Sequence, residues 1–276
     1  MTPPDAMPHR HHHEHAAGFG EHLDREAELA RELTGWALDL ATTALGAPAR
    51  SAIDLGAGTG AGTLALAHRF SDAQVHSLDL SPELLERLAS AAEAAGVAGR
   101  VHRHLVDLDE DWTGVVPEHV DLAWTSLSLH HVADPERVLE RTLAVLRPGG
   151  VLVITEMTST LAFAPDDLGV GRPGLARRLT RALAASGYPP TADWTAPLAA
   201  AGFRAAPPEV RELTVRGDPS GKDYLAGQFA AWQERLADQL DAADLGALAA
   251  VEHDLRAGAS PLTATSGRVV WVAARP

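Results

Sequence analysis

The chain has 276 residues, enough for one large domain with a smaller addition, and its 46% hydrophobic content excludes a disordered protein. Its 23 basic and 37 acidic residues give a net charge of −14, which disfavours nucleic acid as a partner. The absence of cysteine excludes disulfides, thiolate zinc sites and a cysteine nucleophile. The sequence shows no membrane-spanning run and no signal-peptide core, so we expect a cytoplasmic protein without a membrane partner.

Two segments precede the first predicted strand. Residues 1–18 are rich in histidine and proline, which favours a disordered tail with incidental metal affinity, and we predict no metal site. From residue 19 to 48, apolar residues recur at spacings of three and four. This period predicts one helix, an N-terminal helical cap, that ends at Gly46 and Pro48.

Between residues 51 and 156, short apolar runs alternate with helical patterns. The predicted strands are Ser51–Leu55, Gln74–Leu80, Val101–Val106, Val120–Thr125 and Val151–Glu156, and the predicted helices are Gly60–Arg69, Pro82–Ala95 and Pro135–Leu146. Strands separated by helices require crossover connections, so they pair in parallel. The pattern predicts a doubly wound α/β sheet.

The remainder of the chain is less regular. It predicts helices at Leu175–Ala185, Asp193–Ala201 and Leu225–Leu240, and strands at Glu209–Val215 and Arg268–Ala273.

The segment Asp54–Gly60 directly follows the first predicted strand and opens the next helix. Glycines there let the backbone turn sharply and let a ligand approach closely. The pattern Gly56-x-Gly58-x-x-Ala61 also satisfies a loose dinucleotide fingerprint, so a nicotinamide cofactor competes at this point with other ligands.

Three further features bear on the choice of ligand. Asp79 ends the second predicted strand, where a carboxylate can accept hydrogen bonds from both ribose hydroxyls. Asp107 ends the third strand, where it could receive an adenine amino group, and Arg147–Gly150 makes a tight turn before the fifth. Each also has a plain structural interpretation, as a helix cap, a loop residue and a turn respectively.

Taken together, these features resemble the class I S-adenosylmethionine-dependent methyltransferases, whose first motif reads acid-x-Gly-x-Gly-x-Gly. The resemblance is strong over about residues 50–156. It implies a seven-stranded, mostly parallel sheet of order 3-2-1-4-5-7-6 with the last strand antiparallel. It also implies a methyltransferase domain over residues 49–276, with helical cap insertions at about 157–192 and 218–258.

The resemblance implies S-adenosyl-L-methionine as the methyl donor. A dinucleotide places its pyrophosphate at the N-terminus of the helix, whereas a sulfonium donor has no phosphate. The amino-acid ammonium group of the sulfonium donor suits an acid two residues before the first glycine. An acid at that position therefore disfavours the nicotinamide interpretation. Asp54 is such an acid. The donor-binding residues that we expect are Asp54, Gly56, Ala57, Gly58, Gly60, Asp79, Leu80, Asp107, Leu108 and Ser126.

The exit of the fourth strand carries the candidate catalytic residues. A neutral imidazole of His130 or His131 suits the role of general base for an acceptor proton. The alternative is that both histidines only shape the loop and that alignment alone drives transfer. Glu14, His15 or His22 could also fold over the site from the N-terminal side.

We expect the acceptor to be a small organic molecule and not a nucleic acid. Aromatic side chains could wall an apolar acceptor pocket or simply pack in the core: Phe163, Tyr188, Trp194, Phe229 and Trp232. The rival hypothesis is a donor-binding protein of the same fold that catalyses another reaction or assists an assembly. No oligomeric state is predicted.

Overall fold

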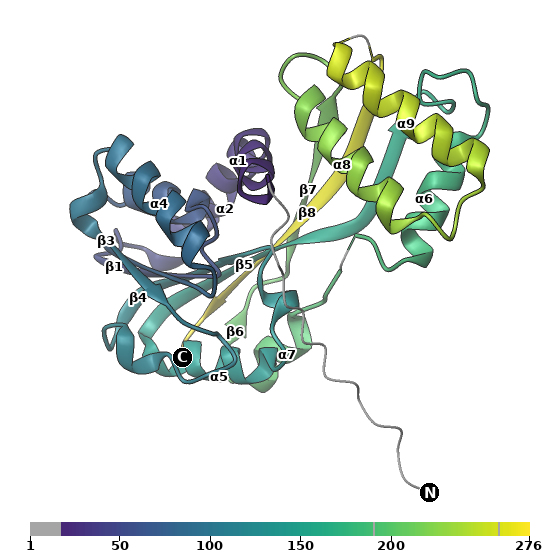
Figure 1. Cartoon of the computed structure of the whole chain (residues 1–276). Coiled ribbons are helices and arrows are strands. Elements are labelled where there is room, and N and C mark those ends of the chain that lie inside the picture. The colour runs from purple at the N-terminus through teal and green to yellow at the C-terminus, as the bar shows by residue number, and fades with distance from the viewer. Residues whose placement is uncertain (1–17, 190, 259) are drawn as a thin grey trace, which may run out of the picture.

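The computed structural model describes residues 18–189, 191–258 and 260–276. The predicted tail, apart from Gly18, therefore lies outside the described residues. Figure 1 shows a sheet flanked by helices, and a second group of helices at the far end of three long strands.

In the described residues, eight strands form one sheet in the order β3-β2-β1-β4-β5-β8-β6, with β7 pairing to β8 off this path. The first five strands pair in parallel, whereas β8 runs antiparallel to β5, β6 and β7. The predicted fold is confirmed, with β8 in the seventh strand's place and β7 as an additional strand. The strands are β1 Ser51–Leu55, β2 Gln74–Asp79, β3 Val101–Leu105, β4 Val120–Ser126, β5 Leu146–Ala164, β6 Arg204–Ala205, β7 Glu209–Arg216 and β8 Thr263–Ala274.

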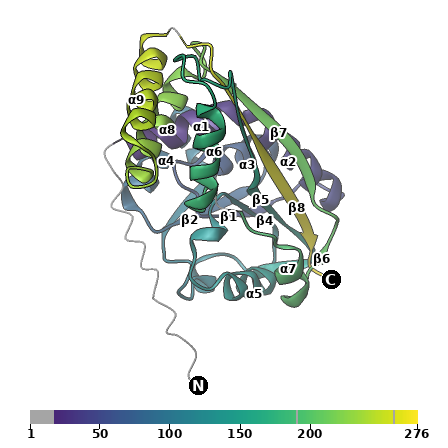
Figure 2. The same cartoon turned by 90° about the vertical axis from the view of Figure 1, so that its right-hand side faces the viewer.

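Helices cover both faces of this sheet (Figures 1 and 2). Successive β5 side chains alternate between two cores, because strand side chains point to opposite faces. Val151 and Val153 pack on the side of α2 and α3, and Leu152 and Ile154 pack on the side of α5 and α7. The helices are α1 Phe19–Leu29, α2 Arg31–Leu45, α3 Ala61–Arg69, α4 Pro82–Ala94, α5 Pro135–Val145, α6 Leu175–Ala185, α7 Thr195–Ala200, α8 Lys222–Arg235 and α9 Ala242–Ala257. Within the described part of the chain, none of them combines the length and apolarity that a membrane crossing requires.

The N-terminal helix differs from the prediction. The single helix expected before Gly46 is divided at Ala30 into α1 and α2. The two helices have different partners: Trp36 and Ala37 bury α2 on the sheet, whereas no residue of α1 is fully buried. The break at Ala30 thus lets α1 contact the glycine loop and α8 while α2 packs on the sheet.

Strand β5 extends eight residues beyond the predicted end at Glu156. Its outer half pairs with β8 from Leu161↔Ser266 to Ala164↔Thr263. The prediction stopped early because Thr158–Thr160 interrupts the apolar run, and Leu161 and Phe163 form only a short alternation after it. The strand is stabilised here by pairing with a distant segment.

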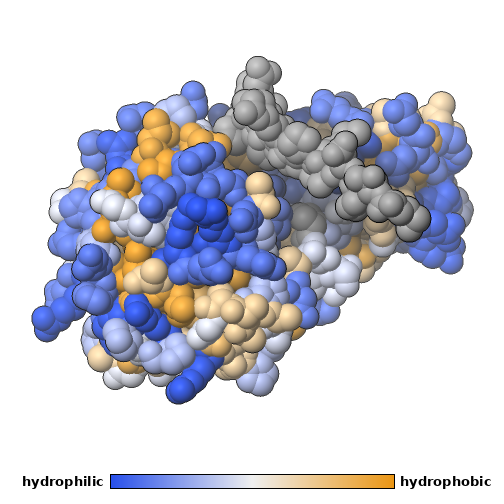
Figure 3. Space-filling view, turned by 90° about the horizontal axis from the view of Figure 1, so that it is seen from below, coloured by the Kyte–Doolittle hydropathy of each residue, from blue (hydrophilic) through white to orange (hydrophobic). Residues whose placement is uncertain are grey.

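The outer parts of β5, β7 and β8 carry α6, α8 and α9, and we call this unit the cap. The cap has its own core, in which Leu179, Phe229 and Leu248 are fully buried. The α9 helix was not predicted, and the predicted helix Leu225–Leu240 ends as α8 at Arg235. In Figure 3 the cap, at the right, shows a mainly hydrophilic surface, while apolar areas gather over the rest of the molecule at the left.

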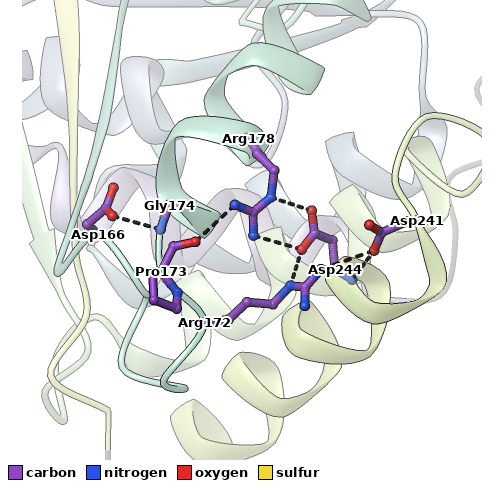
Figure 4. A network of polar contacts seen from close by, with 7 residues as sticks. All are labelled: Asp166, Arg172, Pro173, Gly174, Arg178, Asp241 and Asp244. Carbon is purple, nitrogen blue, oxygen red and sulfur yellow. Dashed lines mark hydrogen bonds and ion pairs between the residues drawn. The ribbon is translucent and has the colours of Figure 1, made fainter.

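A polar network joins α6 and α9 within the cap (Figure 4). The buried Asp244 carboxylate accepts hydrogen bonds from Arg178 at 2.7 and 2.9 Å and from Arg172. Its backbone N–H donates to Asp241, the N-cap residue of α9, at 2.7 Å. The hydrogen bond from Arg178 helps to hold the pKa of Asp244 below its usual value.

We predict that Asp244→Asn lowers the free energy of unfolding by about 1.5–3 kcal/mol at pH 7, because charge-assisted hydrogen bonds are lost. A lowered carboxyl pKa in the folded state contributes stability above the unfolded-state pKa, and this contribution disappears as the pH falls through the folded-state pKa. Urea unfolding at pH 7 and pH 3.5 should therefore show a smaller difference from the parent at the lower pH. Asp238→Asn, at an exposed position, is the control; an equal loss there would contradict the role of the network.

Candidate functional site

The glycine loop between β1 and α3 lies at the carboxyl ends of the parallel strands. Gly56, Gly58 and Gly60 all have positive φ, at 73°, 55° and 97°. A Cβ on Gly56 would lie 1.7 Å from Ser128 Oγ, and one on Gly60 would lie 2.7 Å from Leu88 Cγ. Backbone conformation and close packing therefore both require glycine here.

The loop is fastened to the end of β2. The N–H groups of Gly56 and Ala57 donate to the Leu78 carbonyl at 2.9 and 3.0 Å. Asp79 Oδ2 accepts from the Gly58 N–H at 2.7 Å, and Oδ1 accepts from the Ser81 N–H at 2.9 Å. The Asp79 carboxylate is only half-buried, so it faces the loop and can meet a ligand there.

Asp54 lies beneath the same loop, on the side of α3. Its carboxylate is 2% exposed and accepts a hydrogen bond from Thr63 Oγ1 at 2.7 Å, while Thr63 also bonds to Ser77 at 2.8 Å. Burial raises the pKa of Asp54 to about 7. The side chain is thus part of a buried polar group that anchors β1 to α3.

The residues expected around adenine follow β2 and β3. Leu80 is 64% exposed and Leu105 is 59% exposed, which leaves apolar side chains at the ends of both strands. Asp107 is half-buried and accepts from the Asp109 N–H at 2.9 Å, and Leu108 is buried in the core. Of this expected pair, only Asp107 is accessible.

The chain turns abruptly after β4. Leu127 adopts φ 53°, a left-handed conformation that is strained for leucine, and its N–H donates to the Thr155 carbonyl at 3.0 Å. This turn places Ser128 against Gly56. Ser126, the last residue of β4, is exposed and accepts from Thr155 Oγ1 at 2.7 Å.

The turn leads into a short 3-10 helix, η3 (Leu129–His131), and brings His130 to β5. His130 Nδ1 lies 2.7 Å from Glu156 Oε2. Glu156 is fully buried, and the described residues offer no hydrogen-bond partner to its Oε1. His131 is exposed and its ring centroid lies 4.1 Å from that of His130. The sequence analysis missed Glu156, although an acid at the end of an apolar strand is a signal that could have found it.

Helix α1 spans the glycine loop and the cap. Leu23 lies over Gly58, and Asp24 pairs with Arg87 of α4 at 2.5 Å. Glu26 pairs with the buried Arg268 of β8 at 2.6 Å.

The same helix also contacts the cap helix α8. His22 stacks on Tyr224 at 5.0 Å between ring centroids, and its Nε2 lies 3.0 Å from Gln228 Nε2. Burial lowers the pKa of His22. Its contacts are therefore with α8, while Glu14 and His15 lie outside the described residues.

The aromatic residues considered as pocket walls are mostly packed together. Phe163, Phe229, Trp232 and Tyr188 contact one another in the cap, with ring centroids 5.2–6.1 Å apart. Trp194 is buried in the core of the sheet domain.

An open hollow of about 340 Å³ lies against β5 and β8. Met157, Thr158 and Val269 line it together with Trp271, residues 191–193 and Thr195. It begins directly beyond Glu156, which pairs with Val269. Its volume falls at the lower end of the usual range for small-molecule sites. No group of three or more His, Cys, Asp or Glu side chains in residues 18–189, 191–258 and 260–276 is arranged to hold a metal ion.

The chain is similar to proteins that are named as methyltransferases. A methyltransferase-domain family matches residues 53–152. Trans-aconitate 2-methyltransferase of Methylobacterium radiotolerans is 35% identical over 173 residues, which cover 58% of this chain and 61% of that protein. The tRNA 5-carboxymethoxyuridine methyltransferase of Escherichia coli is 32% identical over 127 residues, covering 46% and 48% respectively. The chain thus spans about half to three fifths of the length of these curated relatives.

A solved structure extends the similarity over nearly all of the chain. The [4+2]-cyclase SpnF is 25% identical with a TM-score of 0.52, and the alignment covers 90% of this chain and 81% of that one.

We predict that Asp54→Asn gains stability relative to the parent as the pH rises. A folded-state pKa of about 7, raised from 3.8, means that ionising this carboxyl costs folding free energy between those pH values, and the cost persists above them. Urea unfolding measures the free energy of unfolding of both proteins at pH 5 and pH 8. Between these two pH values, the free energy of the variant should rise relative to that of the parent by roughly 2–4 kcal/mol. A pH-independent difference, like that expected for the exposed Asp72→Asn, would contradict the raised pKa.

Proposed function

We propose that this chain, which belongs to the class I S-adenosylmethionine-dependent methyltransferase family, transfers a methyl group from S-adenosyl-L-methionine to a small organic molecule. The observation that carries the proposal is the half-buried Asp79 carboxylate, which lies beside the glycine loop. Conformation requires all three glycines of this loop, and close packing also requires Gly56 and Gly60. The family supplies the class of reaction, and the local geometry supports a fit to this donor.

The site has suitable groups for each part of the donor. Asp79 would accept the ribose hydroxyls, and the exposed Leu80 would contact the face of adenine. Asp107 would receive the adenine amino group. Gly56, Ala57, Gly58 and Gly60 would border the amino-acid portion, with Asp54 behind them and Ser126 at the β4 edge; Leu108 would support the adenine site from the core. Bound S-adenosylmethionine supplies an electrophilic methyl group on a positively charged sulfur.

The same geometry disfavours a nicotinamide dinucleotide. A pyrophosphate would need the loop N–H groups, but the Gly58 N–H already donates to the Asp79 carboxylate at 2.7 Å. A phosphate placed there would meet that negative charge at short range. A cationic donor would instead be attracted by it.

Several observations support a small acceptor. The hollow beyond Glu156 has the volume of a small-molecule site, and the net charge of −14 opposes binding of a polyanion. One relative acts on trans-aconitate, a small molecule, and another on a tRNA uridine. The negative charge of this chain opposes a tRNA acceptor.

A second candidate is catalysis of a cyclisation by a donor-binding protein of this fold. The 25% identity with a [4+2]-cyclase over 90% of the chain favours it. Assaying S-adenosylhomocysteine release with a panel of small acceptors separates the two. Release with any acceptor supports methyl transfer, whereas a donor-binding protein that releases none with the full panel supports the alternative.

We predict that Asp79→Ala weakens S-adenosylmethionine binding by about 1.5–3 kcal/mol, or about 10–150-fold, because hydrogen bonds to a charged group are lost. Titration calorimetry measures the affinity, and circular dichroism checks the fold. Asp72→Asn, an exposed acid in the loop before β2, should leave the affinity unchanged. Equal affinity of the Asp79 variant and the parent would remove Asp79 from the donor site.

A further inference from the structure

We propose that Glu156 is a positioning residue that orients His130 as a general base, so that the methyl acceptor is a hydroxyl or ammonium compound. This inference rests on the proposed function and deepens it, because it names the residue pair that prepares the acceptor. It also selects His130 over His131, a choice that the sequence left open.

The contact between the two side chains fixes the tautomer of the imidazole. Glu156 Oε2 lies 2.7 Å from His130 Nδ1, and an ionised carboxylate can only accept, so Nδ1 carries the proton. The other nitrogen, Nε2, then has a free lone pair and can accept a proton. This is the arrangement by which a carboxylate orients a catalytic histidine in other enzymes.

The burial of Glu156 carries a desolvation cost that its contacts do not fully offset. Its side chain is 1% exposed, whereas that of His130 is 12% exposed, so the pair is accessible from the histidine end. Within the described residues, the ion pair of Glu156 is with His130, and its Oε1 has no hydrogen-bond partner. A structural carboxylate would be expected to satisfy both oxygens. Two titratable side chains contact His130: Glu156 on β5 and His131 on η3.

The backbone places this pair beside the donor loop. The strained turn at Leu127 is held by the Thr155 carbonyl, one residue before Glu156. Ser128, which follows Leu127, packs against Gly56 of the glycine loop. The same turn therefore joins three parts: the loop expected to hold the donor, the base and the residue that orients the base. Strain of this kind is characteristic of functional sites.

The step is a proton transfer coupled to methyl transfer. The O–H or N–H bond of the acceptor breaks, and its proton moves to His130 Nε2. The electron pair of the acceptor forms a bond to the methyl carbon as the carbon–sulfur bond breaks, and the electrons of that bond return to sulfur. Glu156 stabilises the resulting imidazolium, which later loses its proton to water.

The pair has a consequence for the class of acceptor. A carboxylate acceptor, with a pKa near 4, is already ionised at neutral pH and needs no base. A hydroxyl or ammonium group must lose its proton before or during attack, and a base contributes about 10²–10⁴-fold there.

The first test is spectroscopic and needs no acceptor. In protein labelled with ¹⁵N-histidine, long-range ¹H–¹⁵N spectra should show His130 protonated at Nδ1, the signal being assigned by its loss in His130→Gln. Glu156→Gln can donate to Nδ1, so it should populate the tautomer protonated at Nε2. Parent protein with His130 protonated at Nε2 would overturn the proposal.

The second test measures S-adenosylhomocysteine release with phenols, alkanols and primary amines, and with matched carboxylates. With a hydroxyl or amine acceptor, His130→Gln should reduce kcat about 10²–10⁴-fold, with donor affinity by calorimetry unchanged. Glu156→Gln should also reduce kcat, up to about 10⁴-fold, and Glu156→Asp should restore part of it. His68→Gln, at an exposed position on α3, is the control and should keep full turnover.

The outcomes separate the two proposals. Retained turnover in both His130→Gln and Glu156→Gln, or a larger loss in His131→Gln, would overturn the assignment of the base. Release with carboxylates alone would overturn the acceptor class but leave the proposed function standing. No release with any acceptor would overturn both.

Discussion

The antiparallel pairing of β5 with β8 is the constraint on which the rest of the structure depends. It runs from Val151↔Ala274 in the sheet to Ala164↔Thr263 in the cap. One end completes the sheet, and the other carries the helices of the cap. Between them lies Glu156, at the point where β5 leaves the parallel part of the sheet. Glu156 is therefore held in its buried position by the same β5–β8 pairing that joins the sheet to the cap.

The acids around the glycine loop illustrate how a sheet edge concentrates charge. Parallel strands end at a common edge, so carboxylates that follow different strands converge there. Asp54 is the penultimate residue of β1 and Asp79 is the last residue of β2. Each is held by donors from a neighbouring segment, Thr63 and Gly58 respectively. The buried acid favours its protonated form, whereas the half-buried one is aligned by two backbone N–H groups. Two side chains of the same chemical type, at the ends of neighbouring strands, thereby acquire different environments.

The sequence predicted what depends on local pattern and missed what depends on distant partners. The first four strands and α6 have strong periodicity and clear boundaries, and the structure has them within about a residue of the prediction. The outer half of β5 has only a short alternation at Leu161 and Phe163. Its strand conformation depends on β8, 99 residues away at Ala164↔Thr263. The same limit applies to the site. The glycine loop is a contiguous motif, but the meeting of His130 with Glu156 depends on a left-handed turn at Leu127 that no propensity favours.

Helix α1 is attached by two ion pairs of very different exposure. In the Asp24–Arg87 pair, both side chains are nearly half exposed, at 48% and 44%. In the Glu26–Arg268 pair, they are 18% and 6% exposed. Mobile ions screen exposed charges far more than buried ones, with a Debye length of about 8 Å at physiological ionic strength. Added salt should therefore weaken the contact of α1 with α4 while its ion pair with β8 persists, so that the attachment of the helix shifts toward the strand side.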